Sequence, residues 1–227
     1  MLRQRLDEIR GRISAAADRS GRPAEAVVLV GVTKTVAADV VRAAIALGLT
    51  DVGENRVQEA QAKIADVGRD QARWHLVGHL QRNKAGRAVE LFDRIHSVDG
   101  VELAEALSRH AVSAGRSLAV LVEVNVSGEA SKFGVAPAGL ESLLERVAAL
   151  PGLRLDGLMT VGPPVEHAEE ARPGFARLRE LRDRAEQTLG LALPELSMGM
   201  SGDFEVAVEE GSTLVRVGTA FFGPRSE

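Results

Sequence analysis

The sequence has 227 residues, of which 45% are hydrophobic, and a net charge of −4 with the two signs interspersed. This length suits one large α/β domain, and the mild, mixed charge gives no electrostatic footprint for nucleic acid or an anionic membrane. The chain contains no cysteine and no tyrosine, which excludes disulfides, thiolate metal sites and phenolic acid–base chemistry from its own side chains. We find no signal-peptide or membrane-spanning pattern and expect a cytoplasmic protein.

The first predicted element is an amphipathic helix. Leu2, Leu6, Ile9 and Ile13 recur at helical spacing between charged residues, which predicts a helix over residues 2–18. Because this helix precedes the first strand, we expect it to pack across the outside or the base of a sheet.

The rest of the chain alternates between strand and helix patterns. We predict strands near residues 27–31, 50–53, 74–78, 94–98, 118–126, 155–161, 195–198 and 213–217. We predict helices near residues 37–47, 57–67, 83–91, 101–114, 138–150, 166–189 and 203–209. This alternation indicates right-handed βαβ units and a parallel sheet, and eight strands are the number that closes a (β/α)8 TIM-type barrel.

No linker or shift in composition divides the chain. We therefore predict a single domain over residues 1–227, with the barrel between about 26 and 223, the additional N-terminal helix and no second domain.

The first strand leads directly to a lysine. Its continuous apolar run is typical of a strand buried on both faces in a parallel sheet. Lys34 would then lie at the carboxyl end of that strand, where α/β barrels bind their ligands. The structural alternative is a lysine that extends its charge from the sheet rim into solvent. The functional alternative is a desolvated amine with a lowered pKa that forms a Schiff base with an aldehyde.

Two short turns rich in small residues, GMSG and GT, follow the last two predicted strands. In barrels the loops after strands seven and eight often hold a phosphate group, and glycine lets the backbone approach a ligand closely. The donors would be the hydroxyl of Ser201 and the backbone N–H groups of Gly218 and Thr219. The structural alternative is that Ser201 or Gly202 simply caps the next helix.

Arg216 alternates with apolar residues in the eighth predicted strand. It shares a strand face with Leu214, so it points into the barrel if Leu214 does. A buried guanidinium needs a partner, because an unpaired buried charge is costly. Glu123 or Asp156 would supply an ion pair, whereas the functional alternative is a cofactor atom. Arginine is one of the two recognised partners of the pyridine nitrogen of pyridoxal phosphate.

The histidines show a metal-like spacing at one place. His75 and His79 are four residues apart, which would put both on one face of a helix. The pattern instead places His75 on a strand and His79 in the following loop, with no flanking carboxylate motif, so we predict no metal site. His79, at a strand end, is a candidate for lining the pocket. His96, His110 and His167 are expected to be ordinary core or surface residues.

Several motifs together resemble one known family. They are Lys34, Gly53-Glu54-Asn55, WHLVGHLQRNK at 74–84, VNVSGEASKFG at 124–134 and LSMGMSGDFEVAVEEGSTLVRVGTAFFG at 196–223. Over essentially its whole length, the chain closely resembles the pyridoxal phosphate homeostasis protein family, whose members are related to the barrel domain of alanine racemase.

The resemblance implies a (β/α)8 barrel that holds pyridoxal 5′-phosphate on Lys34 as an internal aldimine, which is a Schiff base. The other cofactor-binding residues that it implies are Ser201, Gly218 and Thr219 at the phosphate, Arg216 at the pyridine nitrogen, Asn55 near the ring, and His79.

From the family we expect a binding protein that acts in intracellular vitamin B6 homeostasis, without catalytic turnover. A two-base racemase needs a proton donor on each face of the substrate, and the related racemase takes a tyrosine from a second, β-rich domain. This chain has neither that domain nor any tyrosine. An arginine at the ring nitrogen also keeps that nitrogen unprotonated and weakens the ring as an electron sink.

Two alternatives stay open. One is a pyridoxal-phosphate-dependent enzyme with weak amino-acid racemase-type activity, using His79 or a water opposite Lys34. The other is a lysine-dependent aldolase whose substrate phosphate occupies the Ser201 and Gly218 turns. The expected partners are amino acids, as external aldimines, and apo-enzymes that receive the cofactor. Few aromatic residues and no obvious exposed apolar helix face lead us to expect a monomer or weak dimer.

Overall fold

The computed structural model describes residues 1–129, 132–162 and 165–223. Within these residues, eight parallel strands pair in chain order, and the last strand pairs with the first to close a barrel. The strands are β1 Val28–Val32, β2 Asp51–Glu54, β3 Arg73–Leu76, β4 Arg94–Val98, β5 Leu118–Glu123, β6 Leu153–Met159, β7 Glu195–Ser197 and β8 Leu214–Val217. The predicted (β/α)8 barrel is confirmed.

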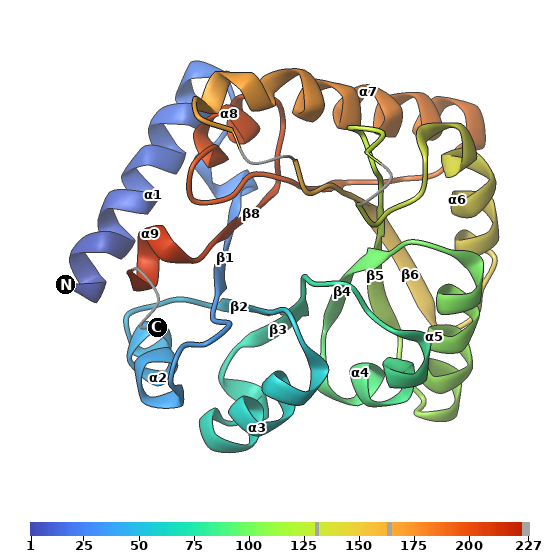
Figure 1. Cartoon of the computed structure of the whole chain (residues 1–227), viewed down its shortest axis with the longest axis horizontal. Coiled ribbons are helices and arrows are strands. Elements are labelled where there is room, and N and C mark those ends of the chain that lie inside the picture. Colours follow the sequence, from blue (N-terminus) through green and yellow to red (C-terminus); the bar gives the residue numbers. More distant parts are fainter. Residues whose placement is uncertain (130–131, 163–164, 224–227) are drawn as a thin grey trace.

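Helices follow the strands and form a ring around the barrel (Figure 1). They are α2 Ala38–Ala46, α3 Val57–Val67, α4 Ala85–Leu91, α5 Val101–Ser113, α6 Leu140–Ala148, α7 Arg172–Leu189 and α8 Phe204–Glu209. Each helix turns an apolar stripe toward the strands, which creates a large hydrophobic layer between ring and barrel.

Strand alternation divides the barrel side chains between that outer layer and the barrel interior. A separate inner cluster consists of Val30, Leu121, Met159 and Leu214. In β8, Val215 and Val217 belong to the outer layer, whereas Leu214 belongs to the inner cluster. Arg216 therefore shares the interior face with Leu214, as predicted, and it is buried.

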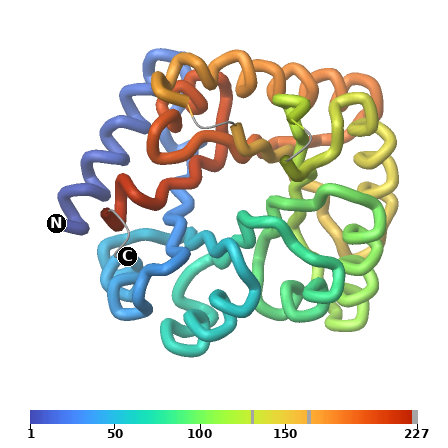
Figure 2. The backbone as a smooth tube through the Cα atoms, viewed as in Figure 1, coloured from blue at the N-terminus to red at the C-terminus, as the bar shows by residue number. Residues whose placement is uncertain are grey.

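The N-terminal helix α1 (Leu2–Arg19) forms where the sequence predicts it. It buries Leu6, Ile9 and Ile13 and packs outside the barrel against α8 and a short helix, α9 (Thr219–Phe222). Figure 2 shows the blue first helix beside the red last described residues. The beginning of the chain therefore packs against the helices that follow β7 and β8.

The strand predicted over residues 118–126 is shorter than its apolar pattern. β5 ends at Glu123, and a single bridge then joins Val124 to Val135. The N–H group of Asn125 donates to the carbonyl of Val135 (3.0 Å). The N–H group of Val124 still donates to Met159 of β6 (2.8 Å), so the backbone leaves the barrel wall at Asn125 and pairs there with the loop that contains Val135.

The segment after β8 differs from its predicted turn. Thr219–Phe222 forms α9, whose Phe221 is buried. The backbone N–H groups of Gly218 and Ala220 donate to the hydroxyl oxygen of Ser201 (3.3 and 3.2 Å). A four-residue helix is too short to be recognised from periodicity. This one also depends on the side chain of Ser201, which lies in the loop after β7.

The helix predicted over residues 166–189 also begins later. A 3-10 turn at Ala168–Ala171 precedes α7, and Pro173 lies in the first turn of α7. Proline suits that position because its missing N–H would be unpaired there anyway.

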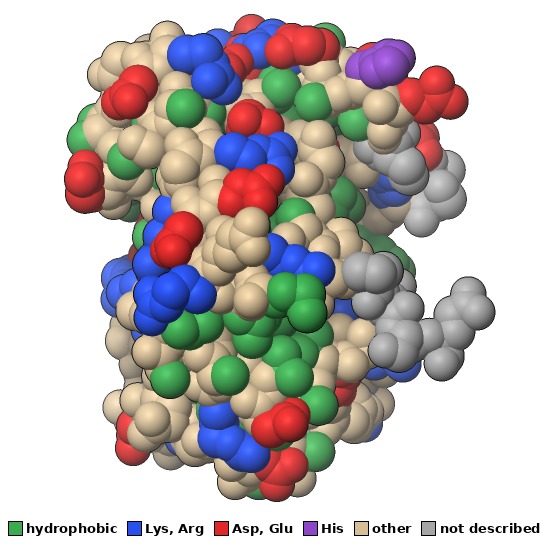
Figure 3. Space-filling model, turned by 90° about the vertical axis from the view of Figure 1, so that its left-hand side faces the viewer, with side chains coloured by type: hydrophobic (Ala, Val, Ile, Leu, Met, Phe, Trp, Pro, Cys, Tyr) green, Lys and Arg blue, Asp and Glu red, His purple; other side chains and the backbone are tan. Residues whose placement is uncertain are grey.

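The molecular surface on the side of α1 is shown in Figure 3, where acidic and basic side chains are intermixed. Among the described residues, no helix combines the length and the apolar character that crossing a bilayer requires.

Candidate functional site

A pocket of about 590 Å³ lies at the carboxyl ends of the barrel strands. The predicted site residues that line it are Lys34, Asn55, Ser201, Arg216, Gly218 and Thr219. These residues are far apart in the sequence. They meet because the carboxyl ends of all parallel strands open at the same end of a barrel.

Lys34 lies on a tight turn directly after β1. The N–H group of Val36 donates to the carbonyl of Thr33 (2.9 Å), which closes the turn around Lys34. Thr35 has a φ of 63°, the only positive φ of a non-glycine residue in the described part of the chain. A β-branched residue rarely adopts this conformation, and it persists only when surrounding contacts hold it. Glu59 supplies one such contact by accepting the N–H of Thr35 (2.5 Å).

A buried ion pair holds the same turn from the side of α3. The ammonium of Lys63 lies 2.5 Å from Glu54 Oε1 and donates to the carbonyl of Thr33 (2.5 Å). The hydroxyl of Thr33 donates to the same Glu54 oxygen (2.5 Å). Burial raises the pKa of Glu54, although Lys63 and Thr33 oppose the rise.

Lys63 and Glu54 were not assigned from the sequence. One signal was present: Lys63 falls on the apolar stripe of α3, together with Ala60, Ile64 and Val67. A lysine on a buried helix face requires a partner charge. Which carboxylate supplies it depends on how α3 packs against β2, so the pairing could not be read from the pattern.

The loop after β7 brings Ser201 to the start of α9. Besides the bonds that Ser201 accepts there, the N–H of Met200 donates to the carboxylate of Asp203 (2.6 Å). Asp203 is the N-cap residue of α8. The structural alternative that Ser201 or Gly202 caps this helix is therefore wrong, and Ser201 instead joins the two loops that follow β7 and β8.

Arg216 is oriented by neutral groups. Its guanidinium donates to the hydroxyl of Ser197 (2.6 Å) and to the carbonyl of Thr160 (2.8 Å). Burial lowers the pKa of Arg216 to about 10, against the attraction of Glu123 and Asp203, so the guanidinium stays protonated at neutral pH.

The two ion pairs predicted as structural alternatives for Arg216 do not form within the described residues. Asp156 pairs instead with Arg94 (3.0 Å) and Arg154 (2.7 Å). Glu123 acts only at longer range, through its effect on the pKa of Arg216. The buried guanidinium therefore has no direct carboxylate partner among the residues that the structure describes.

The structure places His79 apart from the other predicted residues. Its Nδ1 atom lies 3.2 Å from Asp99 Oδ2, and its ring stacks on Phe133 with centroids 3.8 Å apart. His79 is not one of the described residues that line the pocket. His75 lies on β3, as predicted, and contacts His96 inside the barrel.

The fold and the pocket define a class of protein: a parallel (β/α)8 barrel with a ligand site at the carboxyl ends of its strands. The model of the alanine racemase N-terminal domain matches residues 5–226. The chain is 44% identical over 222 residues to the pyridoxal phosphate homeostasis protein of Aquifex aeolicus, spanning 98% of this chain and 97% of that one. The homologous protein of Pseudomonas aeruginosa is 45% identical, with 98% and 95% of the two chains covered.

A solved structure agrees with these relatives. PipY of Synechococcus elongatus, determined with pyridoxal phosphate (PLP) bound, is 40% identical and superposes with a TM-score of 0.85 over 98% of this chain and 100% of that chain. The chain therefore belongs to the pyridoxal phosphate homeostasis protein family, whose barrel is that of the alanine racemase N-terminal domain.

Proposed function

We propose that this protein binds pyridoxal 5′-phosphate as a Schiff base on Lys34 and serves intracellular vitamin B6 homeostasis without catalytic turnover. The observation that carries the proposal is the presence of an amine, a group of hydroxyl and N–H donors, and a guanidinium in one cavity. Relatives that carry the homeostasis name, and PipY with pyridoxal phosphate bound, support it.

The residues of the pocket fit this cofactor. A volume of about 590 Å³ lies in the range of small-molecule sites. The cofactor has an aldehyde, a phosphate and a ring nitrogen, and the pocket offers a matching group for each. Lys34 supplies the amine, and Arg216 supplies a cation for the ring nitrogen. The donors for the phosphate are the hydroxyl of Ser201, the N–H of Thr219, and the N–H of Gly218, which donates to Ser201 (3.3 Å) here and would exchange that bond for the phosphate.

When bound, pyridoxal phosphate supplies a reactive aldehyde and a ring that withdraws electrons best when its nitrogen is protonated. A protonated Arg216 donates to that nitrogen and leaves it without a proton of its own. Among the described residues that line the pocket, Lys34 and Arg216 are the titratable ones. These features support binding without turnover, because a racemase needs an acid and a base on opposite faces of its substrate.

The same chemistry defines the partners that we propose. Free amino acids compete with Lys34 for the aldehyde, and cytoplasmic apo-enzymes take up the released cofactor. We propose that the protein binds and releases the cofactor as a monomer or weak dimer.

The test begins with the visible spectrum of the purified protein after addition of pyridoxal phosphate. We expect an absorption band that disappears on reduction with borohydride and leaves a phosphopyridoxyl group on Lys34, located by peptide mass mapping. Lys34→Ala removes the band, whereas Lys84→Ala, outside the pocket, keeps it. A wild-type protein that stays colourless contradicts the proposal. Loss of the α-proton of alanine to deuterated solvent in the loaded protein contradicts the absence of turnover.

A further inference from the structure

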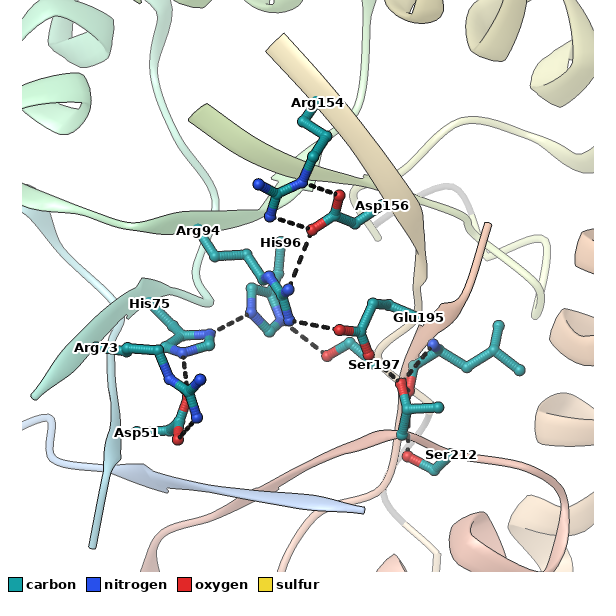
Figure 4. A network of polar contacts seen from close by, with 12 residues as sticks. Asp51, Arg73, His75, Arg94, His96, Arg154, Asp156, Glu195, Ser197 and Ser212 are labelled. Atoms are coloured by element: carbon teal, nitrogen blue, oxygen red, sulfur yellow. Dashed lines mark hydrogen bonds and ion pairs between the residues drawn. The ribbon is translucent and has the colours of Figure 1, made fainter. Parts of the chain in front are cut away.

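The interior of the barrel contains a continuous chain of polar side chains that ends at Arg216. Asp51 of β2 lies 2.9 Å from Nε2 of His75 in β3, and Nδ1 of His75 lies 2.9 Å from Nε2 of His96 in β4. Nδ1 of His96 lies 2.8 Å from the hydroxyl of Ser197 in β7, which accepts from Arg216 (2.6 Å). Figure 4 shows the part of this chain from Asp51 to Ser197.

The two ends of the chain have fixed hydrogen-bonding roles. Arg216 is protonated and can only donate. At the other end, burial raises the pKa of Asp51, but hydrogen bonds from His75 and Arg73 outweigh burial and bring this pKa below its ordinary value. Asp51 is therefore an ionised carboxylate, which can only accept.

Because the roles of the two ends are fixed, they determine which ring nitrogen of His75 and of His96 carries the proton. Burial lowers the pKa of both histidines, so each ring is neutral and carries one N–H. The Nε2–H group of His75 must therefore donate a hydrogen bond to Asp51. Nδ1 of His75 then carries no proton and accepts a hydrogen bond from the Nε2–H group of His96. Nδ1 of His96 then accepts the hydroxyl proton of Ser197, whose oxygen accepts from Arg216. This single arrangement satisfies every group along the chain.

We propose that Ser197, His96, His75 and Asp51 are positioning residues that hold Arg216 in the direction of the cofactor's ring nitrogen. The inference rests on the proposed function, because the ring nitrogen is the group that Arg216 would meet. Ser197 and the carbonyl of Thr160 hold two corners of the planar guanidinium. A guanidinium has five N–H donors, so others remain for a ligand in the pocket, which Arg216 lines.

The chain also explains how the buried charge is accommodated. No carboxylate among the described residues contacts Arg216, but the hydrogen bond that it donates to Ser197 is the first of a series whose last member is accepted by the carboxylate of Asp51. Hydrogen bonds in series polarise one another in a low-dielectric interior. Charges at longer range, those of Glu123 and Asp203, also favour the protonated guanidinium.

The first test needs no cofactor. Nitrogen-15 NMR of the histidine rings in the free protein distinguishes the two neutral tautomers from the cation. We expect His75 and His96 to be neutral at pH 7 with the proton on Nε2. In Ser197→Ala, His96 loses the donor to its Nδ1 and its ring signals shift. The control is Ser108→Ala, which removes another buried serine hydroxyl that donates to the carbonyl of Pro151 (2.6 Å). A charged ring or an Nδ1 proton in the wild type overturns the proposal.

The second test measures the binding of 4-deoxypyridoxine 5′-phosphate, which has the ring nitrogen and the phosphate but no aldehyde. We expect Ser197→Ala to weaken this binding about tenfold, as for loss of one hydrogen bond to a charged group, and to leave the binding of inorganic phosphate unchanged. Ser197→Thr, which keeps the hydroxyl, restores affinity, and Ser108→Ala retains it. An equal loss for both ligands, or no loss, overturns the proposal. A wild type that fails to bind the analogue contradicts the proposed function instead, and the histidine tautomers then decide separately whether the chain exists.

Discussion

Gly78 lies so close to the backbone of Asn55 that no side chain fits between them. A Cβ atom at residue 78 would lie 2.5 Å from the carbonyl oxygen and 2.9 Å from the Cα of Asn55. Asn55, which follows β2, lines the pocket. The absence of a side chain at Gly78, shortly after β3, is therefore what allows Asn55 to take this position.

Replacing Gly78 by alanine is expected to displace Asn55. Overpacking of this kind costs about 1–3 kcal/mol, which a urea titration of the unfolding free energy measures, and we expect pyridoxal phosphate to bind more weakly. The control is Gly11→Ala in α1, where an added Cβ meets nothing within 4 Å. That change should raise stability by up to about 1 kcal/mol, because alanine favours a helix. Equal stabilities of the two variants would disprove the close contact.

Removing the charge of Lys63 is expected to destabilise the protein strongly. Lys63→Met keeps the length of the side chain but leaves Glu54, which is fully buried, without its cation. Breaking one partner of a buried pair costs about 3 kcal/mol or more. The cost should be larger at pH 8 than at pH 5, because the raised pKa of Glu54 lets it become neutral at the lower pH.

The double variant Lys63→Met with Glu54→Gln tests the cause of that loss. Without a buried carboxylate, we expect it to recover part of the stability and to lose the additional pH dependence. If the double variant is as unstable as Lys63→Met at pH 8, the unpaired charge is not the cause.

Glu123 is expected to make stability fall as pH rises. Burial raises its pKa to about 7, with a further contribution from Asp99 and an opposing one from Arg216. The folded state therefore holds this proton up to a higher pH than the unfolded state, whose glutamate titrates near its ordinary pKa of 4.5. Stability is lost between these two values, by about 3 kcal/mol in the limit.

The variant Glu123→Gln should match the wild type near pH 4 and exceed its stability at pH 8. Thermal unfolding over this pH range measures the difference. Glu145→Gln, at an exposed position on α6, should differ little from the wild type throughout. A constant difference between Glu123→Gln and the wild type from pH 4 to pH 8 would contradict the raised pKa.

Arg172 links two helices through three carboxylates. It pairs with Glu169 (2.7 Å), with Glu209 (2.6 Å) and with Glu210 (2.9 Å). We expect Arg172→Gln to cost about 1 kcal/mol at low salt and less at high salt, because salt screens such networks.

The matched control for Arg172 is Arg177→Gln on the same helix. Arg177 forms a single exposed pair with Glu180 at 3.4 Å, and a pair of this kind contributes little. The free energy of unfolding of both variants is measured in urea at low and high salt. If the loss of stability depends on salt equally in the two variants, the network of Arg172 contributes no more than the single pair of Arg177.

The barrel could be predicted because its strands are read from local patterns. β1 (VLVGV) and β5 (LAVLVE) carry apolar runs of their own. Shorter strands such as β7 (ELS) are indicated by their place between helices, and alternation with helices is enough to indicate parallel pairing. α9 could not be predicted, because Thr219–Phe222 is held by Ser201 from another loop. The end of β5 could not be predicted either, because Val124 continues the apolar pattern while its neighbour Asn125 bonds elsewhere.

Residue type in the segments after strands was enough to select Lys34 and Ser201 for the pocket, and strand alternation was enough to select Arg216. The groups that hold them could not be selected in this way. The contact of His75 with His96 depends on the register between β3 and β4. Strand alternation places both rings in the interior, since Trp74 and Ile95 belong to the outer layer, but it does not show which atoms meet.

The pairing of β1 with β8 has a consequence for the order of events during synthesis. Val30, shortly before Lys34, is the register partner of Arg216, so the first and last strands must both exist before the pocket can form. Translation releases the chain from its N-terminus, and β8 is the last strand to leave the ribosome. If the proposed function holds, capture of the aldehyde by this site would therefore report that the barrel has closed. A nascent chain that stops before β8 already carries the lysine but has no pocket around it.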